Sequence, residues 1–178
     1  LDNFYLLQRE YPTVRRALRE AERQRCTRGR LLITAMCRAL LQAGHGRLTQ
    51  ERCALYLAGF QSVTVLQRSE LRLFPGALRA AILAAIASSC RKLGASSEPE
   101  TLTEELAALF GSLTLLTAMD MDTLLNEADI PGQILSEDPA GSYSKMDRMT
   151  KEDYLRRLSE LAEEQGLDEQ TFARRNIK

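Results

Sequence analysis

The segment between Glu70 and Leu93 constrains the fold more than any other part of the chain. Its apolar residues recur every three or four positions and cover more than one side of a helix, so other helices must surround it. We therefore predict a central helix that is capped by Ser69 and bent at Pro75. One side of this helix carries Leu71, Phe74, Leu78, Ile82, Ala85, Ile86 and Ser89, and a second side carries Leu73, Ala77, Ala80 and Leu83.

The rest of the chain has the same helical spacing, with few β-branched residues and almost no alternating pattern. The short run Ser62–Leu66 has no obvious partner strand, and we interpret it as a connection. The fold class is therefore predicted to be all-α, a multi-helix bundle. The expected helices are 3–25 (or two helices divided at Pro12), 31–43, 50–60 after an N-cap at Thr49, 101–117, 122–128, 131–135, 150–166 and 168–175.

A small, polar, Pro-containing segment, GASSEPE at 94–100, is the best linker candidate in the chain of 178 residues. It would divide the chain into an N-terminal helical unit, 1–93, and a C-terminal helical unit, 101–178. Thr101 and Glu104 have the spacing of a capping box directly after this segment. We therefore expect two helical subdomains joined by a short linker.

Charge and targeting signals exclude few function classes. Lys plus Arg equals Asp plus Glu at 24 each, so net charge identifies no partner. The first 30 residues are rich in arginine and could contact anionic lipid or nucleic acid. Acidic residues are interspersed there, which favours a solvated helix face. No signal peptide is recognised, and the longest uncharged apolar run, 80–90, is too short to span a bilayer.

Metal and catalytic chemistry have little support in the sequence. The cysteines, Cys26, Cys37, Cys53 and Cys90, form no C-x-x-C pair, which favours reduced thiols in a cytosolic protein. We expect the single histidine, His45 between two glycines, to be an exposed loop residue. Asp120 and Asp122 superficially match an Asp-x-Asp metal motif, but their place between two helices favours N-capping. The usual nucleotide-binding and hydrolase motifs do not occur, so the residues predict a non-catalytic domain.

Two segments carry more specific patterns. In the first motif segment, 60–83, an aromatic-Gln pair precedes Leu-x-x-x-Glu-Leu-x-x-x-Pro and an arginine; these residues are Phe60, Gln61, Leu66, Glu70, Leu71, Pro75 and Arg79. The second motif segment, 138–154, reads Asp-Pro-x-Gly-x-Tyr-x-x-Met-Asp-x-x-Thr with a later tyrosine; these residues are Asp138, Pro139, Gly141, Tyr143, Met146, Asp147, Thr150 and Tyr154.

In this order, the two segments resemble the N-terminal region of cyclic β-1,2-glucan synthases, large inner-membrane enzymes that polymerise glucose from UDP-glucose. The opening LDNFYLLQREY also resembles the family's Asp-Asn-aromatic start. Three positions depart from the pattern: Arg72 replaces a tryptophan, and Lys151 and Leu155 each replace an arginine. These departures indicate a divergent member.

The resemblance implies that the chain is a piece of a larger enzyme, the soluble helical region that faces the cytoplasm at the bacterial inner membrane. UDP-glucose and a divalent metal are then expected only in the parent transferase module, and no catalytic, cofactor or metal residue is expected here. The implied partners are other domains of the same polypeptide and the cytoplasmic membrane face, not nucleic acid. The alternatives are a free-standing helical protein-interaction or regulatory module and, least favoured, a stand-alone enzyme acting on β-glucans.

The second motif segment has both a functional and a structural interpretation. Tyr143 and Tyr154 beside Asp147 could hold a sugar by stacking and hydrogen bonding. We favour the structural interpretation, in which Pro139 and Gly141 form a turn, Tyr143 and Met146 fill the core, and Asp147 or Thr150 caps the helix. Tyr154 is expected in the buried stripe with Leu158, Leu161 and Ala162. Glu70 is expected either to pair with an arginine such as Arg79 or to favour its helix N-terminus.

Overall fold

The computed structural model describes residues 2–23, 27–93 and 99–177, and every regular element in these ranges is a helix. The all-α, multi-helix prediction is confirmed. The helices are α1 Asp2–Arg23, α2 Thr27–Ala43, α3 Gln50–Gln61, α4 Arg68–Leu71, α5 Phe74–Leu93, α6 Pro99–Ala118, α7 Met121–Ala128, α8 Ile130–Ser136, α9 Arg148–Glu164 and α10 Glu169–Asn176.

The structure settles two uncertain points in the predicted helices, at Pro12 and near Glu70. Pro12 lies inside α1 without dividing it. The predicted helix that begins at Glu70 is divided into α4 and α5, and its first N-cap is Gln67 and not Ser69. Pro75 is the second residue of α5, where its missing N–H needs no partner and its fixed φ suits a new helix start. The connection 62–67 contains no strand, as expected.

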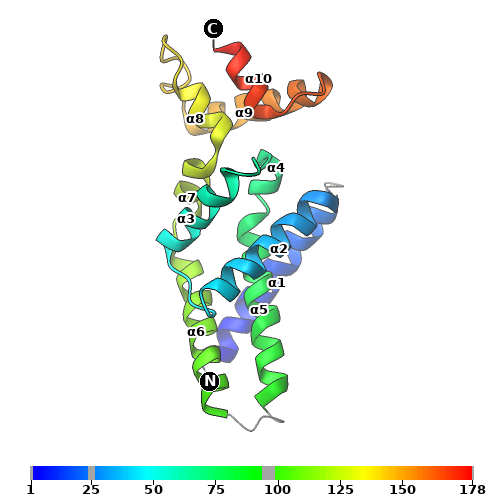
Figure 1. Cartoon of the computed structure of the whole chain (residues 1–178), viewed down its shortest axis with the longest axis vertical. Helices are drawn as coiled ribbons and strands as arrows, with labels where there is room; N and C mark the ends of the chain where they lie inside the picture. The colour runs from blue at the N-terminus through cyan, green and yellow to red at the C-terminus, as the bar shows by residue number, and fades with distance from the viewer. Residues whose placement is uncertain (1, 24–26, 94–98, 178) are drawn as a thin grey trace.

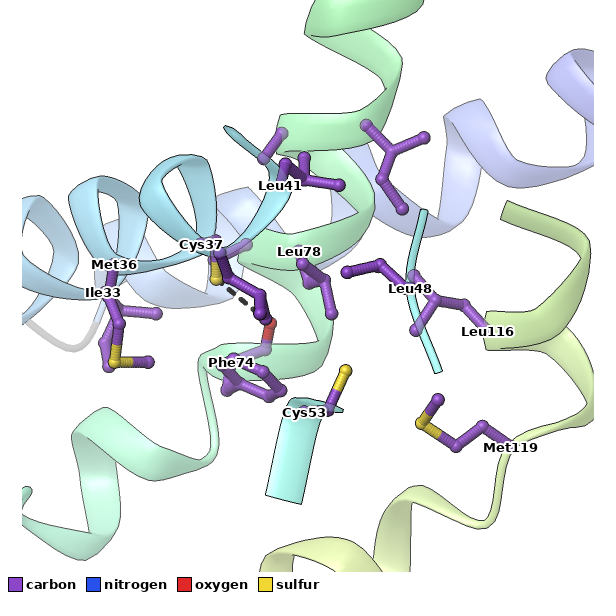
Figure 2. Close-up of a cluster of buried hydrophobic side chains, with 14 of the residues drawn as sticks. Ile33, Met36, Cys37, Leu41, Leu48, Cys53, Phe74, Leu78, Leu116 and Met119 are labelled. Atoms are coloured by element: carbon purple, nitrogen blue, oxygen red, sulfur yellow. Dashed lines mark hydrogen bonds between the residues drawn. The ribbon is translucent and has the colours of Figure 1, made fainter. Parts of the chain in front are cut away.

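The first core surrounds α5, which packs against α1, α2 and α6 (Figure 1). Figure 2 shows side chains from α2, α3, α5 and α6 pointing into a common space around Phe74 and Leu78. Both of these side chains are fully buried. The buried members of this core are Leu6, Ile33, Met36, Cys37, Leu40, Leu41, Leu48, Cys53, Leu57, Leu66, Leu71, Phe74, Ala77, Leu78, Ala81, Ile82, Ile86, Leu109, Leu113, Leu116, Met119 and Leu124.

The second core is smaller and lies at one end of the elongated molecule, where α8, α9 and α10 meet beyond α7 (Figure 1). No buried residue belongs to both cores among the described residues. Its buried members are Ile134, Leu135, Tyr143, Leu155, Leu158, Ala162, Phe172 and Ala173.

The two cores do not divide where the composition suggested. Leu109, Leu113 and Leu116 of α6 belong to the same core as α1–α5, although they follow the predicted linker. The segment 94–100 therefore connects two helices of one core, and the predicted units 1–93 and 101–178 do not match the packing. Residues 94–98 themselves lie outside the described residues. The division between cores falls at the corner between α7 and α8, near Asp129.

The connection between α2 and α3 is fixed by polar contacts that the sequence did not suggest. The Ser112 hydroxyl of α6 donates to the Gly46 carbonyl (2.6 Å) and accepts from the Leu48 N–H (2.9 Å). These bonds hold Leu48 inside the first core. His45 has a left-handed φ of +48°, a conformation that His, Asn and Asp adopt more often than other L residues, and its side chain is exposed, as predicted.

Two thiols are built into the first core. Cys37 and Cys53 are fully buried, and the Cys37 Sγ donates a weak hydrogen bond to the Phe74 carbonyl (3.9 Å; Figure 2). Burial raises the pKa of Cys37 to about 12 and that of Cys53 to about 11. Both therefore act as small apolar residues. Cys90 is free and exposed, and Cys26 lies outside the described residues.

One segment, Arg68–Leu93, is long and apolar enough to cross a membrane by length and composition, with a mean hydropathy of 1.6. A bent pair, Glu100–Ala118 with Met121–Ala128, passes the same test at an angle of 84°. The core helix of a helical bundle has the same composition, and 39% of this apolar window is buried by the other helices. In this fold Leu78 and Ile82 are covered in that way.

We expect Leu78→Ala to lower the free energy of unfolding by about 2–5 kcal/mol, because it leaves a cavity against α2 and α6. Leu55→Ala, at a side chain that is 73% exposed, should change it by less than about 0.5 kcal/mol. Urea denaturation followed by circular dichroism measures both. Equal effects at the two positions would contradict the central placement of α5.

Candidate functional site

The first motif segment contributes mainly to packing. Leu66 and Leu71 are buried in the first core, and Phe60 packs against it. Pro75 starts α5, as described above. Its polar residues Gln61, Glu70 and Arg79 make side-chain hydrogen bonds or ion pairs.

The side chains of Gln61 and Glu70 each form a hydrogen bond with a backbone group. The Gln61 amide Nε2 donates to the Ala128 carbonyl at the end of α7 (2.8 Å). The Glu70 carboxylate accepts from the Gln67 N–H (2.9 Å) and closes the capping box of α4. Of the two roles expected for Glu70, the helix N-terminus is therefore the one observed.

Arg79 has other partners than Glu70. Its Nε lies 3.3 Å from the Glu10 carboxylate of α1, and its Nη2 donates to the Leu116 carbonyl of α6 (3.2 Å). Arg79 therefore ties α5 to both helices that pack beside it.

The first half of the second motif segment is a turn. The Asp138 carboxylate accepts from the N–H groups of Ala140 (3.0 Å) and Ser142 (3.2 Å). Gly141 has a φ of +61°, which requires glycine or a similarly permissive residue. Pro139 is exposed. The predicted Pro139–Gly141 turn is therefore present, with Asp138 as its polar anchor.

The second half of this segment starts α9. Asp147 is the N-cap, and its carboxylate accepts from the Thr150 N–H (3.0 Å) and the Thr150 hydroxyl (2.6 Å). These hydrogen bonds hold the pKa of Asp147 below its ordinary value. Of the two capping residues considered, Asp147 is correct and Thr150 is its donor.

The two tyrosines of the segment differ in burial. Tyr143 is 7% exposed and belongs to the second core, with Met146 packed against that core. Tyr154 is 47% exposed, so the prediction that it lies in the buried stripe is wrong; Leu155 occupies that stripe. The two rings are tilted at 59° with centroids 5.9 Å apart. A sugar-stacking pair would need two accessible rings, and only one is accessible.

A buried ion pair lies where the two cores meet. Asp129 ends α7 and caps α8, accepting from the Gly132 N–H (3.3 Å), and the same carboxylate pairs with the Arg68 guanidinium. The two side chains are only 12% and 9% exposed. The backbone N–H of Arg68 also donates to the Glu169 carboxylate of α10 (3.0 Å). Arg68 therefore joins the start of α4 to the α7–α8 corner and to α10.

The environment of Asp129 is packed and desolvated. Burial raises the pKa of Asp129, and the charge of Arg68 opposes that rise. Burial, with a smaller contribution from the Asp129 carboxylate, raises the pKa of Tyr143 to about 12. A Cβ on Gly132 would lie 3.3 Å from the Asp129 carboxylate and 3.4 Å from the Tyr143 hydroxyl. Glycine therefore allows these groups to approach the backbone of α8.

A small cleft of about 180 Å³ opens beside this ion pair, between α4, α7 and α9. Three arginines, Arg68, Arg72 and Arg148, face three carboxylates across it, and Arg148 pairs with Asp122 (2.8 Å). The cleft is therefore electrostatically balanced and does not select an anion or a cation. The remaining carboxylates are Asp129 and Glu152, and the rest of its lining is Leu71, Leu125 and Asn126.

Metal chemistry finds no support in the part of the chain that the structure describes, where no three His, Cys, Asp or Glu side chains converge on a possible ion. The Asp-x-Asp residues instead have the expected structural role. Asp120 is the N-cap of α7 and accepts from the Thr123 N–H (3.0 Å), and Asp122 pairs with Arg148.

The residues that join the two cores, Arg68, Asp129 and Glu169, were missed by sequence reasoning. Asp129 had one usable signal, an acid two residues before Pro131, which is typical of a helix start. Arg68 and Glu169 had none, since their roles depend on α4 meeting α10 across 101 positions of sequence.

Comparison with family models, curated proteins and solved structures gives no match to this chain. The resemblance to cyclic β-1,2-glucan synthases therefore remains a prediction from the residues of the two motif segments.

We expect Tyr143→Ala to reduce the free energy of unfolding by about 3–5 kcal/mol, because the ring fills the second core. The matched substitution Tyr11→Ala, at a ring that is 61% exposed, should cost less than about 0.5 kcal/mol. Tyr143→Phe should lie between them. Urea titration of all three chains measures this, and a stable Tyr143→Ala chain would revive the sugar-binding interpretation.

The Arg68–Asp129 pair should show strong coupling. Arg68→Met leaves a buried carboxylate unpaired and should cost about 3 kcal/mol at neutral pH. Asp129→Asn keeps an oxygen for the α8 cap, and the double variant should be more stable than the sum of the single losses by about 0.5–3 kcal/mol. Arg148→Met, at an exposed ion pair, is the control and should leave the urea midpoint almost unchanged.

The loss caused by Arg68→Met should depend on pH. The pKa of Asp129 is raised in the folded state, so protonation of this carboxyl favours folding. That contribution is complete below the unfolded-state pKa of about 4 and is lost as the pH rises through the folded-state pKa. The difference between Arg68→Met and the unmodified chain should therefore shrink as the pH falls toward about 4. A pH-independent difference would contradict a buried ion pair.

Proposed function

We propose that the chain is a non-catalytic helical accessory domain of a membrane-bound cyclic β-1,2-glucan synthase. The observation that supports this most is the resemblance of the two motif segments, in their order along the chain, to the N-terminal region of that family. Gln61 binds the end of α7, Glu70 closes the cap of α4, and Asp147 starts α9 under the second core. The polar residues that carry the resemblance thus make local structural contacts, Gln61 and Glu70 beside the first core and Asp147 at the start of α9 in the second core.

In this proposal the domain holds the second core in a fixed orientation for contact with another domain. The first core contains most of the buried apolar residues, and the second core is held at one end of it by the Arg68–Asp129 ion pair and the hydrogen bond from Arg68 to Glu169. Such contacts fix an orientation more strictly than apolar contacts do, because they require particular partners at particular distances. The second core would then meet the transferase or another domain of the parent polypeptide in one defined orientation.

A second candidate function is a free-standing protein-interaction or regulatory module. It is favoured by an apolar groove of about 480 Å³ between α3, α7 and α8. Leu55 lines this groove and is 73% exposed, and nearby in sequence Val63 is 88% exposed. Apolar side chains that are exposed together often mark a protein contact.

The flanking gene sequence distinguishes the two functions. The accessory-domain proposal expects the reading frame to continue into membrane spans and a glycosyltransferase module, and a frame that ends near Lys178 without spans would overturn it.

If the chain is instead a free-standing interaction module, we expect affinity purification to recover a soluble partner in a fixed ratio, and Leu55→Glu in the groove to abolish its recovery. For either function the isolated chain should release no glucose from β-1,2-linked oligosaccharides.

A further inference from the structure

The exposed side of α1 carries one sign of charge. Between residues 4 and 19 the helix has four arginines and a single acid, Glu10. Glu10 is only 5% exposed and is directed into the structure, where it lies 3.3 Å from Arg79 and 3.1 Å from Arg9. The arginines are all exposed, and they are Arg9, Arg15, Arg16 and Arg19. Between residues 4 and 19, the single acid is thus turned away from this face by the packing of the helix.

The same side carries three exposed aromatic rings. Phe4 is 64% exposed, Tyr5 67% and Tyr11 61%. Phe4 and Tyr11 are seven residues apart and lie along one line of the helix, and Arg15 follows one turn later. The opposite side holds Leu6 and Val14, which are buried. The aromatic rings are therefore not part of the packing of α1 on α5 and are exposed on its outer side.

We propose that this face of α1, Phe4–Arg19, docks on an anionic lipid surface. Helices that lie in a membrane interface combine aromatic rings, which enter the boundary between headgroups and acyl chains, with arginines that contact anionic headgroups. The span of 16 residues is about 24 Å long, enough to contact several headgroups. The inference is independent of the proposed parent enzyme, because a free-standing module would present the same face.

The shape of the face favours a lipid surface over other anionic partners. It is a convex ridge on a single helix, which a flat surface can cover along its whole length. A bound peptide helix would need a groove, and the two clefts beside the cores lie on α3, α4 and α7–α9. A nucleic acid would need a basic track that follows its phosphates, and three aromatic rings interrupt the arginines here.

Vesicle binding tests the proposal directly. The chain contains no tryptophan, so Phe4→Trp adds a single reporter to this face. Its emission should shift to the blue with vesicles of phosphatidylcholine containing about 30% phosphatidylglycerol, and not with phosphatidylcholine alone. Co-sedimentation of the unmodified chain should show the same selectivity and should weaken as salt screens the arginines. Equal binding to both vesicles, or to neither, would overturn the proposal.

Variants locate the contact on α1. Arg15→Gln with Arg16→Gln and Arg19→Gln should weaken binding to the anionic vesicles by more than about tenfold. Phe4→Ser with Tyr11→Ser should also weaken it. All five side chains are exposed, and melting temperatures will verify that each variant is folded.

Matched controls remove similar groups from other surfaces. One control replaces exposed arginines on α5 and α10: Arg91→Gln with Arg174→Gln and Arg175→Gln. The other control, Leu55→Ser with Val63→Ser, removes exposed apolar side chains on and near the groove. These controls should leave vesicle binding unchanged. Loss of binding in the controls but not in the α1 variants would overturn the assignment, as would tighter binding to a short DNA or RNA strand than to the vesicles.

Discussion

Burial of α5 is the constraint on which the rest of the structure depends. Its apolar residues face α1, α2 and α6, so none of these helices can bury its own apolar side without it. Arg79 adds direction to this packing, because it reaches the Glu10 carboxylate on one side and the Leu116 carbonyl on the other. The division at Arg72–Leu73, followed by Pro75 in the first turn of α5, lets α4 keep Leu71 in the first core while Arg68 reaches Asp129 and α10.

The meeting of the two cores is polar, and this has a physical consequence. Apolar contacts tolerate small shifts, whereas the Arg68–Asp129 pair loses its compensation for desolvation as soon as its partners separate. Arg68 Nε is buried without a hydrogen-bond partner in the described part of the chain, so the pair is not optimised for stability alone. We interpret it as a device that selects one orientation of the second core.

Two surfaces, the cleft beside the ion pair and the exposed side of α1, differ in their charge. The cleft beside the joint is balanced in charge, and its residues are engaged with one another. The exposed side of α1 is unbalanced, with arginines and aromatic rings and no accessible acid between residues 4 and 19. Contacts with other molecules are therefore expected on the outer helices, while the joint maintains the shape that presents them.

The sequence by itself determined the all-α class, most of the helices and the burial of Phe74, Leu78 and Ile82, because helical spacing records which side of each helix is apolar. It also determined the turn at Gly141 and the N-caps at Thr49, Asp120 and Asp147, since these depend on residues a few positions apart, but not the N-caps at Gln67 and Asp129. It gave the wrong division at 94–100, because a polar composition does not reveal that α6 returns to α5. Only the tertiary structure decided that Arg68 meets Asp129 and Glu169, that Tyr154 is exposed while Tyr143 is buried, and that Glu10 is buried against Arg79 of α5. Each of these depends on contacts between segments far apart in the chain, which local periodicity does not encode.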